Sequence, residues 1–350
     1  MKFTEIITAR LISQQLVDPH YKKVKDLVAW MGAIQAQDYN MAKWAIGIRL
    51  PGSTEKMVEK AIEKGEIIRT HVLRPTWHFI ASEDVYWLLE LTGPHIQTKL
   101  KTRQKHLELT EKIIRKSHKL FEKALEGGEH LTREELMYIL TKAKIIISDN
   151  RSSHLLVSAE LEGIICNGAP RAKKQTYALL EKRVPRLIQL NREEALAKLA
   201  GKYFQSHGPA TVQDFIWWSG LPAGDGKKAL EMIKASLMAE TIKKQTYWFP
   251  SSFSFRLKDK QPIYLLPAYD EFIVSYRDRT AIFEPEHHNK SISKNGIFYP
   301  VILKKGLATG TWRPVREKGS LTVEVEFFNP KNKISLGGLE KASRVLKSFY

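Results

Sequence analysis

Two glutamines separated by one residue are the first candidate for chemistry in this sequence. Gln35 and Gln37 flank Ala36 and are followed by Asp38, at the end of a helical pattern that contains Trp30. Residues two apart do not share a helix face, so both amides can reach a common pocket only where the helix ends or unwinds. Asp38 could act as a general base or could cap the next helix. The alternative for the glutamines is structural, with their side chains bonding nearby backbone at a helix terminus.

A second group of polar side chains lies in the segment RTHVLRPTWHF at 69–79. Its pattern predicts two strands around an Arg74-Pro75 corner. Because alternate residues of a strand point to one face, we predict a single polar stripe beside a tryptophan. The stripe consists of Arg69, His71, Arg74, Thr76 and His78. It could bind anions or bases, and the alternative is a solvated face of the hairpin.

The sequence gives little sign of a metal or a cofactor. His71 and His78 lack a third ligand at suitable spacing, and His287-His288 in a turn-rich loop is no stronger a candidate. There is no GxGxxG after a strand, no GxxxxGK[ST] and no GxSxG, which argues against nucleotide-dependent and hydrolytic enzymes of those kinds. The single cysteine, Cys166, lies in an apolar stretch, and we expect a buried structural thiol and a reducing compartment.

Composition and charge point to a folded protein with a polyanionic partner. The 350 residues are 43% hydrophobic, enough for two or three packed units. The formal net charge is +18, which suits nucleic acid because each cation that meets a phosphate releases counterions. An anionic membrane surface could use the same charge, but no apolar run approaches the roughly 18–20 residues that span a bilayer. The N-terminal residues are not those of a signal peptide, so we expect a cytoplasmic protein.

The order of the predicted elements repeats along the chain. Helical patterns at 4–16 and 22–34, a third helix from Thr54 to Gly65 and the hairpin give three helices followed by two strands, which is the outline of a winged helix. We place this first module at 1–92 and a second at 93–190. A third module at 191–257 contains the candidate recognition helix GDGKKALEMIKASL and a strand, TIKKQTYWFP.

Two features distinguish the later part of the chain. The second module opens with a long basic helix over 93–125, which carries nine Lys or Arg between Gln97 and Lys123 against three Glu. Thr132 with Glu135 predicts a capping box, and Thr211 predicts another helix start. Residues 258–350 change to β texture and predict a small antiparallel β unit with a terminal helix.

Several segments in this order resemble a known family. They are Gln35-Ala36-Gln37, RTHVLRPTWHF at 69–79, HGPATVQDFIWWSGLP at 207–222, LLPAYDEFIVSYRDR at 265–279 and GTWRP at 310–314. Together they resemble the winged-helix DNA-binding domain family of AlkZ/YcaQ-like DNA glycosylases. The resemblance implies a mainly α fold with β (α+β), in which three tandem winged-helix modules and a C-terminal β unit form a curved, basic surface for DNA.

The resemblance also assigns roles to residues. It implies that Gln35 and Gln37 are catalytic, although Ala36 is smaller than the bulky aliphatic residue common in the family. Arg74, Thr76 and His78 match the family's Arg-x-Thr-x-His, with Pro75 in place of a frequent glycine. The residues that we expect to contact DNA or to line the lesion pocket are Asp38, Arg69, His71, Arg74, Thr76, His78, Lys99, Lys101, Arg103, Lys105, Arg277 and Arg279.

The function implied is that of a monofunctional DNA glycosylase. Its substrates would be N7-alkylated purines or bulky and cross-linked adducts in double-stranded DNA, and it would need no metal or other cofactor. We expect a monomer in the cytoplasm, associated with the nucleoid and not with a membrane. The alternative is a non-catalytic winged-helix regulator or architectural protein, since winged helices most often bind DNA without altering it.

Overall fold

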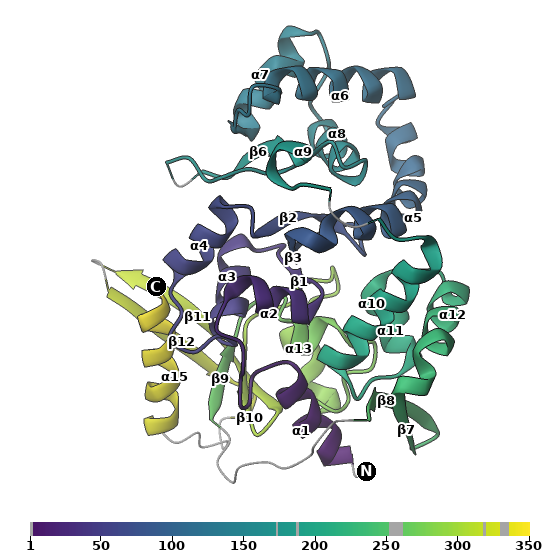
Figure 1. Cartoon of the computed structure of the whole chain (residues 1–350). Helices are drawn as coiled ribbons and strands as arrows, with labels where there is room; N and C mark the ends of the chain where they lie inside the picture. Colours follow the sequence, from purple (N-terminus) through teal and green to yellow (C-terminus); the bar gives the residue numbers. More distant parts are fainter. Residues whose placement is uncertain (1–2, 173, 187–188, 252–261, 318–319, 330–335) are drawn as a thin grey trace. The chain divides into compact units, whose positions relative to one another are not determined.

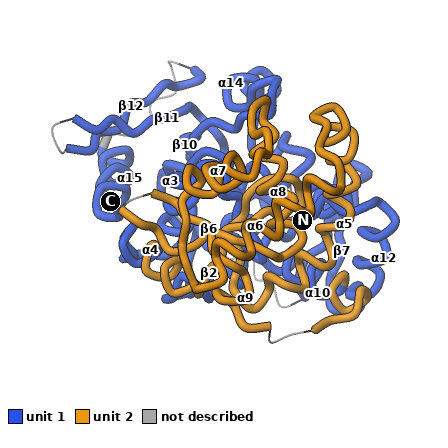
Figure 2. The backbone as a smooth tube through the Cα atoms, turned by 90° about the horizontal axis from the view of Figure 1, so that it is seen from above, with its two compact units in different colours: residues 1–58, 197–350 blue, residues 59–196 orange. Residues whose placement is uncertain are grey.

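The computed structural model describes residues 3–172, 174–186, 189–251, 262–317, 320–329 and 336–350 (Figure 1). The chain divides into two compact units, one of residues 1–58 and 197–350 and one of residues 59–196 (Figure 2). We call them unit 1 and unit 2. Both combine helices with small antiparallel sheets, which confirms the predicted α+β class. The finer division into three modules and a β unit stays a prediction.

The N-terminal part of unit 1 is helical. Its elements are α1 (Phe3–Ser13), α2 (Val24–Met31), β1 (Ile34–Gln35), α3 (Tyr39–Gly47) and α4 (Glu55–Glu63), which continues into unit 2. Helix α2 is shorter than predicted because Gly32 ends it with a φ of +75°. The Gln35–Gln37 segment therefore lies beyond the helix, between α2 and α3.

Unit 2 begins with the predicted hairpin, β2 (Ile67–Val72) and β3 (Thr76–Ala81). The strands pair antiparallel, with Val72 opposite Thr76 across a three-residue turn in which Leu73 has a φ of +61°. A short 3-10 helix (Ser82–Asp84) leads into α5 (Val85–His106). Helix α5 packs on β2, and its Gly93 lies so close to α8 that an added Cβ would be 2.9 Å from the carbonyl oxygen of Leu161.

The single long helix predicted over 93–125 is wrong. The structure has α5, which starts earlier and ends at His106, and a separate helix α6 (Glu111–Leu125) that Thr110 caps through Ile113 N. The chain turns between them at Glu108, with a φ of +52°. Leu107 and Leu109 on either side of that turn are buried, so burial of these two side chains accompanies the break.

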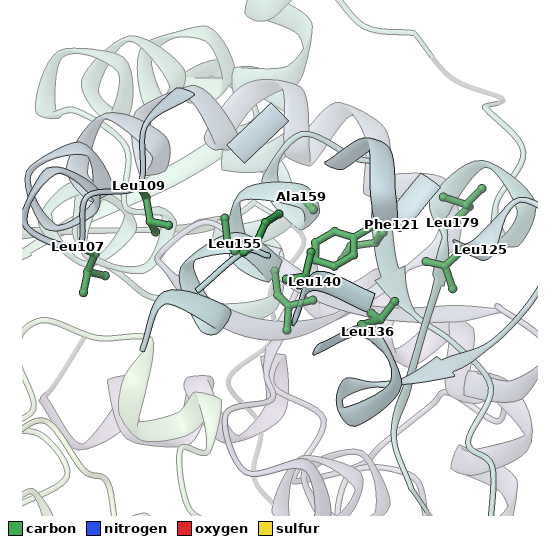
Figure 3. Packing of buried hydrophobic residues seen from close by; sticks show 12 residues of the cluster. Leu107, Leu109, Phe121, Leu125, Leu136, Leu140, Leu155, Ala159 and Leu179 are labelled. Carbon is green, nitrogen blue, oxygen red and sulfur yellow. The ribbon is translucent and has the colours of Figure 1, made fainter. Parts of the chain in front are cut away.

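The remainder of unit 2 consists of short helices and a three-stranded sheet. Its elements are β4 (Leu131–Thr132), α7 (Arg133–Lys142), α8 (Arg151–Leu161), β5 (Ile165–Asn167), β6 (Thr176–Leu179) and α9 (Leu180–Arg183), with strand order β4-β6-β5. The predicted capping box of Thr132 and Glu135 is confirmed. Figure 3 shows the core, in which Phe121, Leu140 and Leu155 are fully buried among the apolar side chains of α6, α7 and α8.

The second part of unit 1 starts with three helices and a hairpin. They are α10 (Arg192–His207), α11 (Val212–Ser219), α12 (Ala223–Ile233), a short 3-10 helix (Lys234–Ser236), β7 (Leu237–Ile242) and β8 (Gln245–Pro250). Thr211 caps α11, as predicted, and the structure shows that it does so in a capping box with Asp214. The segment TIKKQTYWFP is a hairpin and not one strand, because Lys243 and Lys244 both take positive φ and make a two-residue turn.

A four-stranded antiparallel sheet completes unit 1, as the β texture predicted. Its strands are β9 (Ile263–Leu266), β10 (Val301–Lys304), β11 (Leu307–Glu317) and β12 (Ser320–Phe327), in the order β12-β11-β10-β9. Between β9 and β10 the chain forms α13 (Glu271–Val274), a 3-10 helix (Pro285–His287) and α14 (His288–Ser291). The terminal helix α15 (Leu336–Phe349) packs on β9, on β12 and on α3, beside the sheet in Figure 1.

Candidate active site

The Gln35–Asp38 segment combines a buried and an exposed amide. Gln35 is only 6% exposed and Ala36 is fully buried, whereas Gln37 and Asp38 are exposed. The side chain of Asp38 accepts a hydrogen bond from Met41 N at 3.0 Å. Asp38 thus caps α3, which was one of its two predicted roles. Gln37 is therefore an exposed residue that directly follows two buried ones, Gln35 and Ala36.

Glu271 anchors the backbone of this segment. Its carboxylate is fully buried at the start of α13, and its Oε1 accepts a hydrogen bond from the backbone N–H of Gln35 at 2.6 Å. Its Oε2 accepts from Trp218 Nε1 at 3.1 Å and from the hydroxyl of Ser275. Charge-assisted bonds of this kind are about twice as strong as neutral ones. The carboxylate therefore ties the motif to α11 and α13.

His207 lies against the same carboxylate. Its ring stacks on Tyr203 with centroids 5.0 Å apart, and its Nε2 is 3.6 Å from Glu271 Oε2. The residue is fully buried, and this burial lowers the pKa of the imidazole in spite of the nearby carboxylate. The neutral form of His207 is therefore favoured, while Glu271 accepts hydrogen bonds from Gln35 N, Trp218 Nε1 and the Ser275 hydroxyl.

A second buried carboxylate, Asp270, binds Arg49 of the segment after α3. The guanidinium donates to Asp270 Oδ1 at 2.7 Å and to Oδ2 at 2.8 Å, and both side chains are buried. Arg49 also donates to Gln14 Oε1 at 3.0 Å, and Gln14 donates to the hydroxyl of Tyr276 at 3.0 Å. This polar network connects α1 and α3 with residues 270–276, so the backbone around the glutamines has support from several elements.

Asp270 and Glu271 are site residues that the sequence reasoning missed. The segment LLPAYDEFIVSYRDR supplied Arg277 and Arg279 as candidates, but its two acids were not singled out. A signal was present, since two carboxylates inside an otherwise apolar run are rarely buried without partners.

The polar residues of β2 gather around Trp77 of β3. The Arg69 guanidinium lies 4.4 Å from the Trp77 ring centroid, and the His71 ring is also 4.4 Å from it. His71 contacts buried Glu160 of α8 through Nδ1 at 2.5 Å, and the backbone N–H of Arg69 donates to Asn167. A pocket of about 400 Å³ within unit 2 is lined in part by Arg69, Trp77, Glu160 and Asn167. His71 does not line it.

The predicted single stripe along the hairpin is wrong. Residues directly opposite in an antiparallel pair lie on the same face, and His71 pairs with Trp77 while Thr70 pairs with His78. Thr76 and His78 are thus on the other face from Arg69 and His71. The odd-numbered turn changes the parity between the strands, and Arg74 sits half-buried in that turn. His78 is fully buried, and its Nδ1 is 3.0 Å from the carbonyl oxygen of Thr76.

The remaining predicted DNA contacts are cations on other elements. Four of them are exposed near the end of α5 and form two pairs at i,i+4 spacing: Lys99 with Arg103 and Lys101 with Lys105. Arg277 is exposed and follows α13. Arg279 is half-buried: its Nε donates to Ile273 O at 2.9 Å.

Two further sequence predictions concern metal and thiol chemistry. In the described residues Glu284, Glu286 and His287 bring three ligand atoms within 4.8 Å of one another, close to the His287-His288 pair considered above. Both glutamates are exposed, and exposed acidic groups of this kind are common without an ion. Cys166 is fully buried as predicted, and burial raises the pKa of its thiol to about 12.

Comparison with known proteins defines the class of this chain as a DNA glycosylase, because the family model for AlkZ-like DNA glycosylases matches residues 28–348. The chain belongs to the AlkZ-like DNA glycosylase family. This confirms the predicted family and enzyme class over the non-catalytic alternative. Comparison with curated proteins gives no match.

The fold agrees with a solved member of the same class. The structure of the DNA glycosylase AlkZ from Streptomyces sahachiroi superposes with a TM-score of 0.83 at 18% sequence identity, and the match covers 99% of this chain and 96% of that one. Among the described helices, none has the length and apolar character that crossing a membrane requires.

Proposed function

We propose that the protein hydrolyses the N-glycosidic bond of N7-alkylated purines or of bulky and cross-linked adducts in double-stranded DNA, as a cytoplasmic, nucleoid-associated monomer. Gln35 and Gln37 are the catalytic pair in this proposal. The observation that carries it is the Glu271 bond to Gln35 N, which fixes the motif while the Gln37 amide remains exposed. Because Gln37 is exposed and its segment is held in place, its side chain can contact a substrate as large as a DNA duplex.

Neutral amide side chains are sufficient for this hydrolysis when the leaving base is already activated for departure. An N7-alkylated purine already carries a positive charge, so its departure needs little acid assistance and the sugar approaches an oxocarbenium-like state. The Gln37 amide oxygen then positions the attacking water and stabilises the positive charge at C1′, while Gln35 holds that water or the nearby backbone. One well-placed polar group of this kind lowers the activation barrier by roughly 3–4 kcal/mol.

The affinity for DNA comes from the cations in this proposal. The net charge of +18 favours a polyanion, and the exposed pairs on α5 together with Arg277 supply candidate phosphate contacts. Arg69, which lines the pocket beside Trp77, and its buried neighbour His71 are candidates for contacts with the lesion. Arg74, Thr76 and His78 support the hairpin from its turn and its other face.

The test is release of N7-methylguanine from a methylated duplex. Gln37→Ala should slow excision by roughly two to three orders of magnitude while DNA affinity stays unchanged. Gln213→Ala, at an exposed glutamine of α11, is the matched control and should excise at the wild-type rate. Excision by Gln37→Ala at the wild-type rate would contradict the catalytic assignment, and salt-sensitive binding without base release by the wild type would contradict the substrate.

A further inference from the structure

The guanidinium of Arg279 lies near two aromatic rings in unit 1. Its guanidinium carbon lies 5.3 Å from the ring centroid of Trp217 and 5.1 Å from that of Phe298. The Arg279 Nε donates to Ile273 O at 2.9 Å, and Trp217 Nε1 donates to Val274 O at 2.9 Å. Both side chains are thereby fixed to α13, the helix whose Glu271 anchors the glutamine motif. The guanidinium of Arg279 is thus held near two aromatic rings by its hydrogen bond to Ile273 O.

Tyr269 adds a third aromatic ring to this group. The rings of Tyr269 and Phe298 are 5.9 Å apart, and Tyr269 directly precedes the buried pair of carboxylates. Tyr269 has a φ of +57°, a conformation that is strained for an aromatic residue and that tertiary contacts must maintain. Because Glu271, two residues further on, accepts the hydrogen bond from Gln35 N, Tyr269 belongs to the same segment that anchors the glutamine motif.

Much of this aromatic surface is open. Trp217 is 41% exposed and Tyr299 is 44% exposed, values that are high for such large side chains. We call the set Trp217, Tyr269, Arg279, Phe298 and Tyr299 the aromatic platform. Exposed aromatic groups that alternate with a guanidinium match the requirements for stacking planar bases, because every base offers a π-face and each cation adds to the attraction.

We propose that the aromatic platform stacks unpaired bases of DNA beside the Gln35–Asp38 segment. This inference rests on the proposed function, since an enzyme for bulky or cross-linked adducts meets duplexes whose bases are displaced. Bases are the ligand that the uncharged rings of Trp217, Phe298 and Tyr299 can stack, and the Arg279 guanidinium, which itself lies against two of these rings, adds a cation to that surface. The strongly positive chain supplies the backbone attraction separately.

The experiment measures fluorescence anisotropy of two labelled duplexes, one fully paired and one with three bulged bases. The wild type should bind the bulged duplex more tightly. Trp217→Leu and Phe298→Leu should each weaken binding of the bulged duplex by about tenfold and leave binding of the paired duplex unchanged. Neither substitution removes a charge, so the slope of log affinity against log salt should stay the same, whereas each lost phosphate contact would change it by about 0.9.

Control variants protect the test against misfolding. Tyr299→Leu changes an exposed side chain and should reproduce part of the loss without altering thermal unfolding. Tyr138→Leu, at a tyrosine of α7 that is 63% exposed, should behave as the wild type with both duplexes. Arg279→Lys keeps the charge and removes the planar group, so it should resemble Phe298→Leu.

Three results would overturn the proposal: equal wild-type affinity for the two duplexes, an unchanged preference in Trp217→Leu, Phe298→Leu and Tyr299→Leu, or a reduced salt slope in those variants. The readout is binding and needs no excision. Failure of the platform therefore leaves the Gln37→Ala result standing, and failure of base release leaves the binding preference measurable.

Discussion

Replacing Glu271 by glutamine tests whether the buried carboxylate positions the proposed catalytic motif of Gln35 and Gln37. The change keeps the size of a fully buried side chain, removes its negative charge and alters its hydrogen-bonding. The carboxylate accepts from Gln35 N, Trp218 Nε1 and the Ser275 hydroxyl. A carboxamide has one acceptor oxygen and an NH₂ group that only donates. Trp218 Nε1 and the Ser275 hydroxyl both donate to Oε2, so the amide oxygen of the new glutamine should occupy the position of Oε2. Its NH₂ group then faces the backbone N–H of Gln35, and neither group can accept a hydrogen bond.

Two effects of Glu271→Gln can be given a magnitude: the loss of the hydrogen bond from Gln35 N, and the displacement of the glutamine motif that follows from it. A hydrogen bond to a charged group contributes about 1.5–3 kcal/mol, so the unfolding free energy of Glu271→Gln should fall by about that amount. Two donors 2.6 Å apart must separate, and a displacement of about 1 Å at a catalytic group can slow a reaction about 100-fold. We therefore expect excision to slow about 100-fold, measured as single-turnover release of N7-methylguanine with enzyme in excess.

Ser275→Ala is the matched control because it removes a donor from the same carboxylate and leaves the bond to Gln35 N in place. It should lower stability by about 1 kcal/mol with an excision rate close to that of the wild type. Wild-type excision by Glu271→Gln, or an equal slowing by Ser275→Ala, would refute the positioning argument. Urea unfolding of each variant separates a loss of stability from a loss of rate.

Three further predictions concern stability. Arg49→Ala leaves buried Asp270 without its guanidinium partner and should lower the free energy of unfolding by about 3–5 kcal/mol in urea. Gly93→Ala should lower the midpoint of thermal unfolding because its Cβ would be 2.9 Å from a backbone oxygen, whereas Gly201→Ala in open space should stabilise α10 by roughly 0.5–1 kcal/mol. Burial lowers the pKa of His207 below the ordinary value of 6.5, so the unfolded chain binds more protons than the folded chain under acidic conditions. The free energy of unfolding should therefore keep its full value above pH 6.5 and fall as the pH drops below it. His207→Phe should show a weaker dependence on pH.

Each of these predictions has an outcome that contradicts it. Arg115→Ala breaks an exposed i,i+4 pair with Glu111 and should leave stability nearly unchanged, so an equally small effect of Arg49→Ala would argue against the buried pair. A stabilising Gly93→Ala would show that α5 and α8 can separate without loss. An identical pH dependence in the wild type and His207→Phe would remove this histidine as the cause.

Local signals in the sequence predicted much of the secondary structure. Thr132 and Thr211 begin helices because a hydroxyl cap and an acid three residues later satisfy free backbone N–H groups, a rule that depends on neighbouring residues alone. The break between α5 and α6 has no glycine or proline to signal it. It depends on Leu107 and Leu109 entering a core that distant helices complete, and a local pattern does not contain that information.

The candidate site shows the same division. The glutamine pair stood out by residue type, but its anchor Glu271 is 236 residues away in the sequence, so only the tertiary fold brings them together. The face of each hairpin residue depended on the length of the turn at Leu73, whose positive φ is unusual for leucine. A shift of one residue in that turn reverses which side chains stand together.

Because Cys166 is buried, its reactivity toward thiol reagents can report local opening of the sheet in unit 2. It is the single cysteine of the chain and lies in β5, and a thiol with a pKa of about 12 forms almost no thiolate near neutral pH. An electrophile can modify it only when the sheet of unit 2 opens transiently. The rate of labelling by a thiol reagent under native conditions thus measures how often this sheet opens, without an introduced probe.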